Sequence, residues 1–123
     1  MDKQQAINNF WNSFGILAYD ENSVPDDAKM PYITYNVSTG DFGDTVVMSA
    51  SVWYRANSWT YLDLMANRIS SYIGYGGITI PIDNGMIWIK RSSPFSQRMS
   101  DDGEVKRTLL TIAAEYLTQE RER

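Results

Sequence analysis

The chain has 123 residues and a formal net charge of −4, and it contains neither cysteine nor histidine. The absence of cysteine excludes disulfide bonds and thiolate zinc sites, and the absence of histidine removes the commonest general base and transition-metal ligand. Lysine and arginine are scattered along the sequence, so it shows none of the basic clustering that nucleic-acid binders display. The length predicts a single domain, residues 1–123.

The first predicted element is an amphipathic helix at residues 3–14, with apolar residues at the i, i+3, i+4, i+7 spacing. Gly15 follows at the position of a helix C-cap glycine. The apolar stripe of this helix either packs on a sheet or docks on a neighbouring subunit. Residues 16–19 predict a short extended segment, and 20–30 predict a loop whose acids do not have the spacing of a calcium-binding loop.

The middle of the chain predicts two strands and a second helix. Residues 31–39 alternate apolar and polar side chains, and the glycine-containing stretch 40–44 is typical of a hairpin connection. Residues 45–54 form the central strand, with one half-buried face. Residues 58–73 carry an apolar stripe at helical spacing, which we expect to cover that face.

The last third predicts a hairpin, a loop and a final strand. Residues 78–83 and 86–91 flank Asn84-Gly85, the strongest short signal for a hairpin turn. Pro81 cannot donate to a strand ladder and therefore predicts an edge strand. Residues 92–104 are polar and predict a long loop. Residues 105–118 alternate and predict a strand, and the QERER tail after them predicts a frayed end.

Together these elements predict an α+β fold, an antiparallel sheet of four to five strands with two helices packed on one face. The sequence carries no P-loop, no G-x-G-x-x-G after a strand and no G-x-S-x-G motif. No spacing singles out a carboxylate pair either. We therefore expect no catalytic residues, no cofactor and no metal site, and interpret the chain as a non-enzyme.

Two tryptophans are predicted on the polar face of their strands, where large apolar side chains are not expected. Trp53 and Trp88 each fall on the face opposite to the apolar neighbours in the same strand. Large apolar side chains on the second face of a sheet indicate a covered surface. The cover is either a loop of the chain itself, 16–30 or 92–104, or a neighbouring subunit, because interfaces are enriched in aromatic residues.

Several stretches resemble a known family. They are NFWNSFG at 9–15, AYD at 18–20, VP at 24–25, PYITY at 31–35, SVWYR at 51–55 and SW at 58–59. In this order they are similar to small tail proteins of phages and prophages of Gram-positive bacteria, the tail terminator or tail-completion proteins of long-tailed phages. The resemblance extends over residues 7–116, and its motifs are structural.

The resemblance implies a structural role in the virion tail, after assembly in the bacterial cytoplasm. Such proteins form a ring, a hexamer as a rule, which caps the tail tube, ends polymerisation of the tube protein and presents a surface to the head connector. DNA passes through the lumen without sequence-specific binding. On this hypothesis Trp53 and Trp88 contribute to the oligomer interface, and Phe95, Arg98 and Met99 of the 92–104 loop contact the tube.

Two other interpretations stay open. One is another small head–tail connector or head-closure protein, which differs in its partner. The other is a small-molecule or peptide-binding α+β module, which predicts a well-formed apolar pocket.

Overall fold

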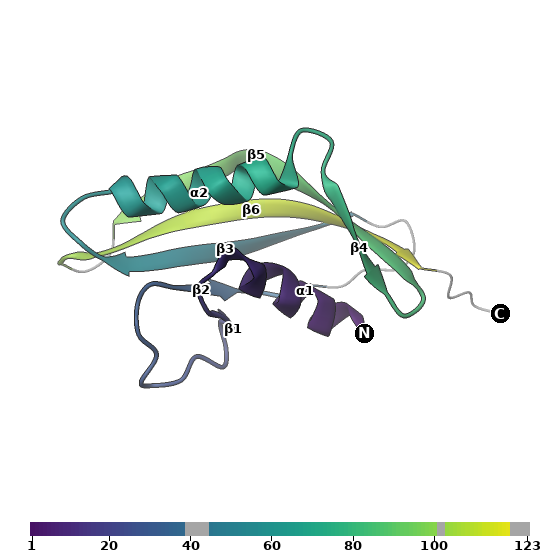
Figure 1. Cartoon of the computed structure of the whole chain (residues 1–123), viewed down its shortest axis with the longest axis horizontal. Helices are drawn as coiled ribbons and strands as arrows, with labels where there is room; N and C mark the ends of the chain where they lie inside the picture. Colours follow the sequence, from purple (N-terminus) through teal and green to yellow (C-terminus); the bar gives the residue numbers. More distant parts are fainter. Residues whose placement is uncertain (39–44, 101–102, 119–123) are drawn as a thin grey trace.

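The computed structural model of the chain describes residues 1–38, 45–100 and 103–118. The elements follow one another as α1 (Lys3–Trp11), the 3-10 helix η1 (Asn12–Phe14), β1 (Ala18–Asp20), β2 (Tyr32–Tyr35), β3 (Thr45–Arg55), α2 (Thr60–Ile73), β4 (Ile78–Ile82), β5 (Gly85–Ser100) and β6 (Val105–Thr118). Figure 1 shows the helices in front of a twisted layer of strands. The predicted connection at 40–44 and the predicted tail at 119–123 lie outside the described residues, as do residue 39 of the predicted strand and residues 101–102 of the predicted long loop.

The strands of the described residues form one six-stranded sheet in the order β1-β2-β3-β6-β5-β4. β1 runs parallel to β2, whereas the other neighbouring strands are antiparallel. The prediction of an α+β fold with an antiparallel sheet of four to five strands is therefore wrong, because the described chain is mostly strand and its one sheet is mixed and larger. The additional strand is β1, whose three residues are too few to show a recognisable alternation.

The predicted long loop at 92–104 is also wrong over most of its length. Residues 92–100 continue β5, which pairs with β6 as far as Ser100 opposite Lys106. The register shifts between Arg91 and Ser96, so a bulge containing Pro94 interrupts the strand. A bulge breaks the period-two signal, and the polar residues on both sides of it resemble a loop in composition.

β4 and β5 form the predicted hairpin, and β4 lies at the sheet edge, as Pro81 predicted. Its turn begins one residue earlier than predicted. Ile82 is opposite Gly85, so Asp83 and Asn84 form the turn instead of Asn84 and Gly85. The register therefore differs from the prediction by two residues. A shift by an even number leaves each side chain on its expected face.

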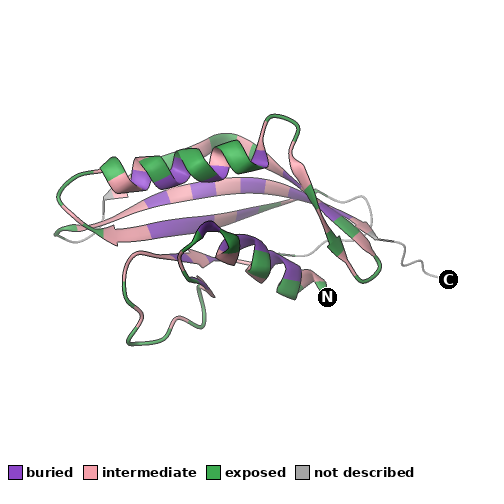
Figure 2. Cartoon of the chain, in the orientation of Figure 1, coloured by how far each residue is buried: buried purple, intermediate pink, exposed green. Residues whose placement is uncertain are grey.

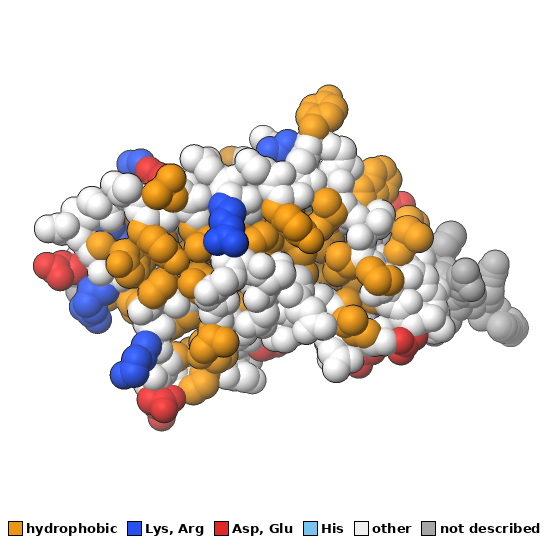
Figure 3. All heavy atoms as spheres, viewed as in Figure 1, with side chains coloured by type: hydrophobic (Ala, Val, Ile, Leu, Met, Phe, Trp, Pro, Cys, Tyr) orange, Lys and Arg blue, Asp and Glu red, His pale blue; other side chains and the backbone are white. Residues whose placement is uncertain are grey.

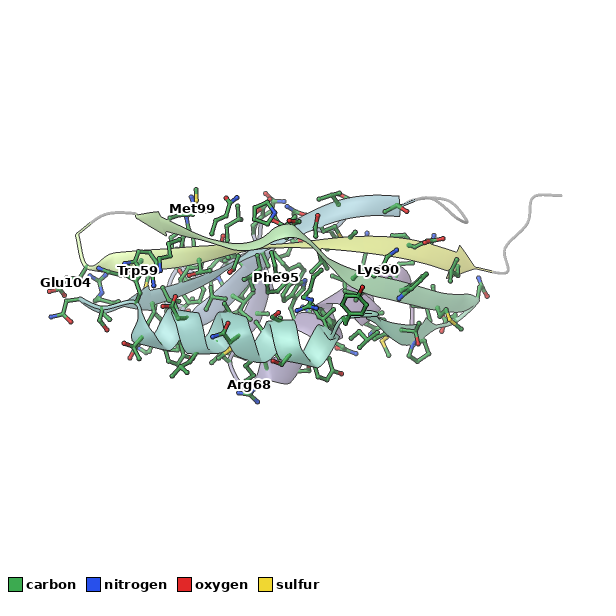
Figure 4. All side chains as sticks on the ribbon, turned by 90° about the horizontal axis from the view of Figure 1, so that it is seen from above. Trp59, Arg68, Lys90, Phe95, Met99 and Glu104 are labelled. Atoms are coloured by element: carbon green, nitrogen blue, oxygen red, sulfur yellow. The ribbon has the colours of Figure 1, made fainter. Side chains whose placement is uncertain are left out.

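Both helices pack on the same face of the sheet, which we call the inner face (Figure 4). Buried side chains of the strands and of both helices meet between these layers, as the alternating colours of the strands in Figure 2 show. The largest fully buried side chains are Trp11, Tyr116, Ile7, Ile33, Met48, Leu62, Ile69, Ile73, Ile87, Ile89, Leu110 and Ile112.

Helix α1 illustrates how local sequence fixes this packing. The Asp2 carboxylate accepts a hydrogen bond from the backbone N–H of Gln5 at 2.8 Å and caps the helix. After η1, Gly15 adopts a left-handed conformation with φ of 94°, which ends the helical segment. Ile7 and Trp11 between these ends are fully buried. The apolar stripe of α1 is therefore part of the core of the chain.

Candidate functional site: the outer face of the sheet

The outer face of the sheet is the one turned away from the helices. In Figure 4 no helix lies over it. Some of its apolar side chains are accordingly exposed: Val47 retains 61% of its accessible surface and Met86 42%. A sheet with one helix-covered face, and exposed apolar side chains on the other, is a candidate for contact with another molecule.

A row of side chains, which we call the aromatic band, crosses five strands of this face. The pairing places Tyr32 opposite Trp53, Trp53 opposite Arg107, and Arg107 opposite Met99. Tyr19 of β1 extends the row, because its ring centroid lies 5.8 Å from that of Tyr32. At the usual strand spacing of about 4.8 Å, the band spans roughly 19 Å across β1, β2, β3, β6 and β5.

Trp53 is the central residue of the band and is held from three sides. Its indole Nε1–H donates to Thr34 Oγ1 at 2.9 Å. Its ring lies 6.5 Å from the Tyr32 ring, between centroids, and the Arg107 guanidinium lies 5.3 Å from its centroid. Arg107 itself donates to Ser51 Oγ at 3.3 Å. These contacts fix the large side chains before any partner arrives, which reduces the conformational entropy lost on binding.

Trp88 lies on the same face but not in the same place. It is opposite Glu115 of β6, eight residues along that strand from Arg107, the partner of Trp53. That separation corresponds to roughly 26 Å at about 3.3 Å per residue. The Trp88 indole donates to the carbonyl oxygen of Gly76 at 3.0 Å, and Lys90 Nζ lies 4.2 Å from its ring centroid. The two tryptophans therefore do not form one site.

The three residues predicted to form a tube-contact loop are distributed along β5 instead. Phe95 lies in the bulge and packs against the core cluster. Arg98 is on the inner face, where its Nη2 lies 2.6 Å from Asp63 Oδ2 of α2. Met99 is on the outer face and belongs to the aromatic band. The structure thus separates Arg98 from Met99 by the thickness of the sheet.

Cover of Trp53 by a loop of the same chain was one of the two open interpretations. Residues 92–100 are part of the sheet itself, and the connection from β1 to β2 extends beyond the sheet edge in Figure 1. Neither described segment lies over the aromatic band. The described residues therefore do not support cover of Trp53 by either loop.

Sequence reasoning missed Tyr19, Tyr32 and Arg107 as members of the outer face. Tyr32 alternates with the core residues Ile33 and Tyr35, so its side was predictable. Arg107 could be placed beside Trp53 only from the register between β3 and β6, which period-two patterning does not determine.

The helix side of the molecule carries a smaller feature. Apolar side chains gather between α2 and α1 in Figure 3. A hollow of about 210 Å³ lies near Phe10, Tyr72, Ile80 and Pro81. This volume is below the range of roughly 300–1,000 Å³ typical of small-molecule pockets.

Two searches for other kinds of site were negative. Within residues 1–38, 45–100 and 103–118, no group of three or more Asp and Glu side chains is placed to hold a metal ion. In the same ranges no helix is both long and apolar enough to cross a membrane. No family model matches the chain, and no curated protein matches it.

Proposed function

We propose that this chain is a structural protein of virion assembly, of the phage tail-terminator type. Several copies form a ring, a hexamer by the resemblance, that caps the tail tube, stops tube polymerisation and provides the surface for joining the head. The partners are further copies of the chain, the tube protein and the head connector. DNA passes through the ring without sequence-specific contacts.

The observation that supports this proposal is the aromatic band on a sheet face that no described helix covers. Tryptophan, tyrosine and arginine are the residues that contribute most to protein–protein binding. In the band all three types stand side by side on rigid strands, around Trp53. A preorganised surface of this kind suits contact with another folded subunit.

The small-molecule-binding alternative has less support. It requires an apolar pocket that encloses a ligand, whereas the hollow beside Phe10 and Tyr72 measures about 210 Å³.

The proposal is tested by measuring the solution mass of the chain with light scattering, alone and after mixing with tail tube protein from the same genome. We expect a ring-sized species of several 14.1 kDa chains, most abundant when tube protein is present. A chain that stays monomeric in both samples would contradict the proposal. Binding of the head connector without any response to the tube would favour the head-closure alternative.

A further inference from the structure

One edge of the sheet is open along more than half of its longest strand. β4 pairs with β5 only from Gly85 to Ile89, so from Lys90 onward the described residues place no strand on that side of β5. This edge faces the viewer in Figure 4, where no ribbon stands in front of it. Backbone N–H and C=O groups on such an edge are available to another chain.

The two outermost strands differ from this edge because some of their outward backbone groups are already bonded or missing. At β1, the side-chain amide of Asn12 bonds to the backbone N–H and C=O of Ala18. At β4, Pro81 lacks an N–H, and the carbonyl of Met1 accepts from the N–H of Asp83 at 2.9 Å. Among the described strands, the open part of β5 is the longest stretch that lacks a neighbouring strand on one side.

Charge distinguishes the open edge from the opposite side of the sheet. Lys90, Arg91 and Arg98 lie along the open part of β5, and only Arg98 has a carboxylate partner among the described residues, Asp63. Arg91 is exposed and donates to the Ser70 hydroxyl at 2.7 Å, which leaves its charge uncompensated there.

The segment that leads from β1 to β2, beyond the far edge of the sheet, has the opposite sign. It contains Asp20, Glu21, Asp26 and Asp27 against one cation, Lys29. Backbone hydrogen bonds hold its beginning on the sheet: the N–H of Glu21 donates to the Tyr35 carbonyl at 2.8 Å. Asp26 and Asp27 are exposed. The molecule is thus acidic beyond one edge of its sheet and basic at the other.

We infer that the acidic segment of one copy, residues 20–29, docks along the open β5 edge of the next copy, beside Lys90 and Arg91. This inference depends on the proposed function in one respect only, which is that copies of the chain associate. Two β5 edges facing each other would bring like charges together, which disfavours a two-fold dimer through this edge. Contact between unlike edges is directional, and repeated directional contacts close into a ring when the rotation permits.

Charge reversal tests the inference. One variant is Asp26→Lys with Asp27→Lys, and the other is Lys90→Glu with Arg91→Glu. All four side chains are on the surface, and circular dichroism verifies that both variants fold. Arg68→Glu is the matched control, because Arg68 is an exposed cation on α2, where Figure 4 shows it pointing away from the sheet.

We expect each reversed variant alone to associate at least about tenfold more weakly than wild type, whereas Arg68→Glu assembles as wild type does. In an equal mixture, copies of the two variants can alternate around the ring, so that opposite charges meet at every contact. The mixture should therefore regain a ring-sized mass with an even number of copies. Assembly of the wild type should weaken as the salt concentration rises.

The outcomes separate this inference from the proposed function. If wild type assembles but the reversals have no effect, or the mixture does not recover, the docking arrangement is wrong and the ring proposal stands. A mixture that stops at two copies contradicts a directional contact. If wild type does not associate even with tube protein, both proposals fall together.

Discussion

The side chain of Asn12 takes the place of a neighbouring strand beside Ala18. Its Oδ1 accepts from the Ala18 N–H at 2.9 Å, and its Nδ2 donates to the Ala18 carbonyl at 3.2 Å. These two groups lie on the side of β1 that faces away from β2, since the neighbouring Leu17 carbonyl bonds to Ile33. One amide thus completes the hydrogen bonding at the end of the sheet and ties the C-terminal end of the first helical segment to β1.

Replacing Asn12 with leucine should therefore destabilise the fold by about 1–3 kcal/mol, because it leaves a buried N–H and C=O without partners. Ala18 is only 5% exposed, so water cannot replace the lost bonds easily. Urea denaturation measures the change. Asn9→Leu on the exposed side of α1 is the control and should change the free energy of unfolding by less than about 0.5 kcal/mol. Equal stability of the two variants would show that Asn12 does not close the edge.

Replacing Trp53 with glutamate should abolish oligomerisation while the monomer remains folded. The substitution places a charge at the centre of the aromatic band and removes the bond to Thr34. We expect it to cost about 1–3 kcal/mol of stability, less than the roughly 5–15 kcal/mol of a typical domain. Light scattering and circular dichroism report the two effects separately.

Two further variants make the Trp53 result specific. Met99→Glu alters the same band from another strand and should also prevent assembly. Leu64→Glu introduces the same charge on α2, where Leu64 is 64% exposed, and should leave assembly unchanged. If both Trp53→Glu and Met99→Glu form normal oligomers, the outer face is not part of the interface.

Gly77 should tolerate no side chain. Its φ is +83°, and a Cβ there would lie 2.5 Å from the Ile89 carbonyl oxygen and 2.8 Å from Trp88 Nε1. Gly77→Ala therefore forces β4 and the Trp88 side chain to shift, with an expected loss of about 2–3 kcal/mol in thermal or urea unfolding. Gly76→Ala is the control, since a Cβ at Gly76 would meet nothing within 4 Å. A Gly77→Ala variant as stable as Gly76→Ala would contradict the close approach at Gly77.

Tyr116 should make the stability of the fold fall in alkaline solution. Burial raises the pKa of Tyr116 to about 12, from an ordinary value of 10.0. Between these values an unfolded chain loses the proton and the folded chain keeps it, so stability decreases as the pH rises from 10 to 12. The full shift corresponds to at most about 2.7 kcal/mol.

The Tyr116→Phe variant should lose most of this alkaline decrease. At neutral pH it should also be less stable by about 1 kcal/mol, because the Tyr116 hydroxyl donates to the Ser38 carbonyl at 2.7 Å. Burial raises the pKa of Tyr61 as well, so a smaller decrease remains in the variant. Tyr75→Phe, at a fully exposed position, should behave as wild type. If the stability of wild type and of Tyr116→Phe falls equally steeply with pH above 10, Tyr116 is not the group responsible for the decrease.

Long elements with regular periodicity, such as α2 and β3, were predicted to within two residues. β1 was missed as a strand because its three residues show no pattern of their own. Pairing with β2 at Ile33 and the hydrogen bonds from Asn12 hold them in the sheet. The second half of β5 was missed because the bulge around Pro94 interrupts its alternation.

For the candidate site too, only what depends on the periodicity of a single strand could be predicted. Alternation placed Trp53 and Trp88 on the outer face, since that requires only the period of one strand. The order and register of the strands decide which side chains are neighbours, and they depend on contacts distant in sequence. The separation of the two tryptophans and the position of Arg107 beside Trp53 therefore came only from the structure.

The most direct test of the proposed function is the length of tail tubes polymerised in the presence of the chain, measured by electron microscopy. The tube protein from the same genome is assembled with wild type, with Trp53→Glu and with Leu64→Glu. We predict short tubes that end in a ring with wild type and Leu64→Glu, and long, uncapped tubes with Trp53→Glu. Tubes of the same length with and without the wild-type chain, and bare at both ends, would contradict the tail-terminator function.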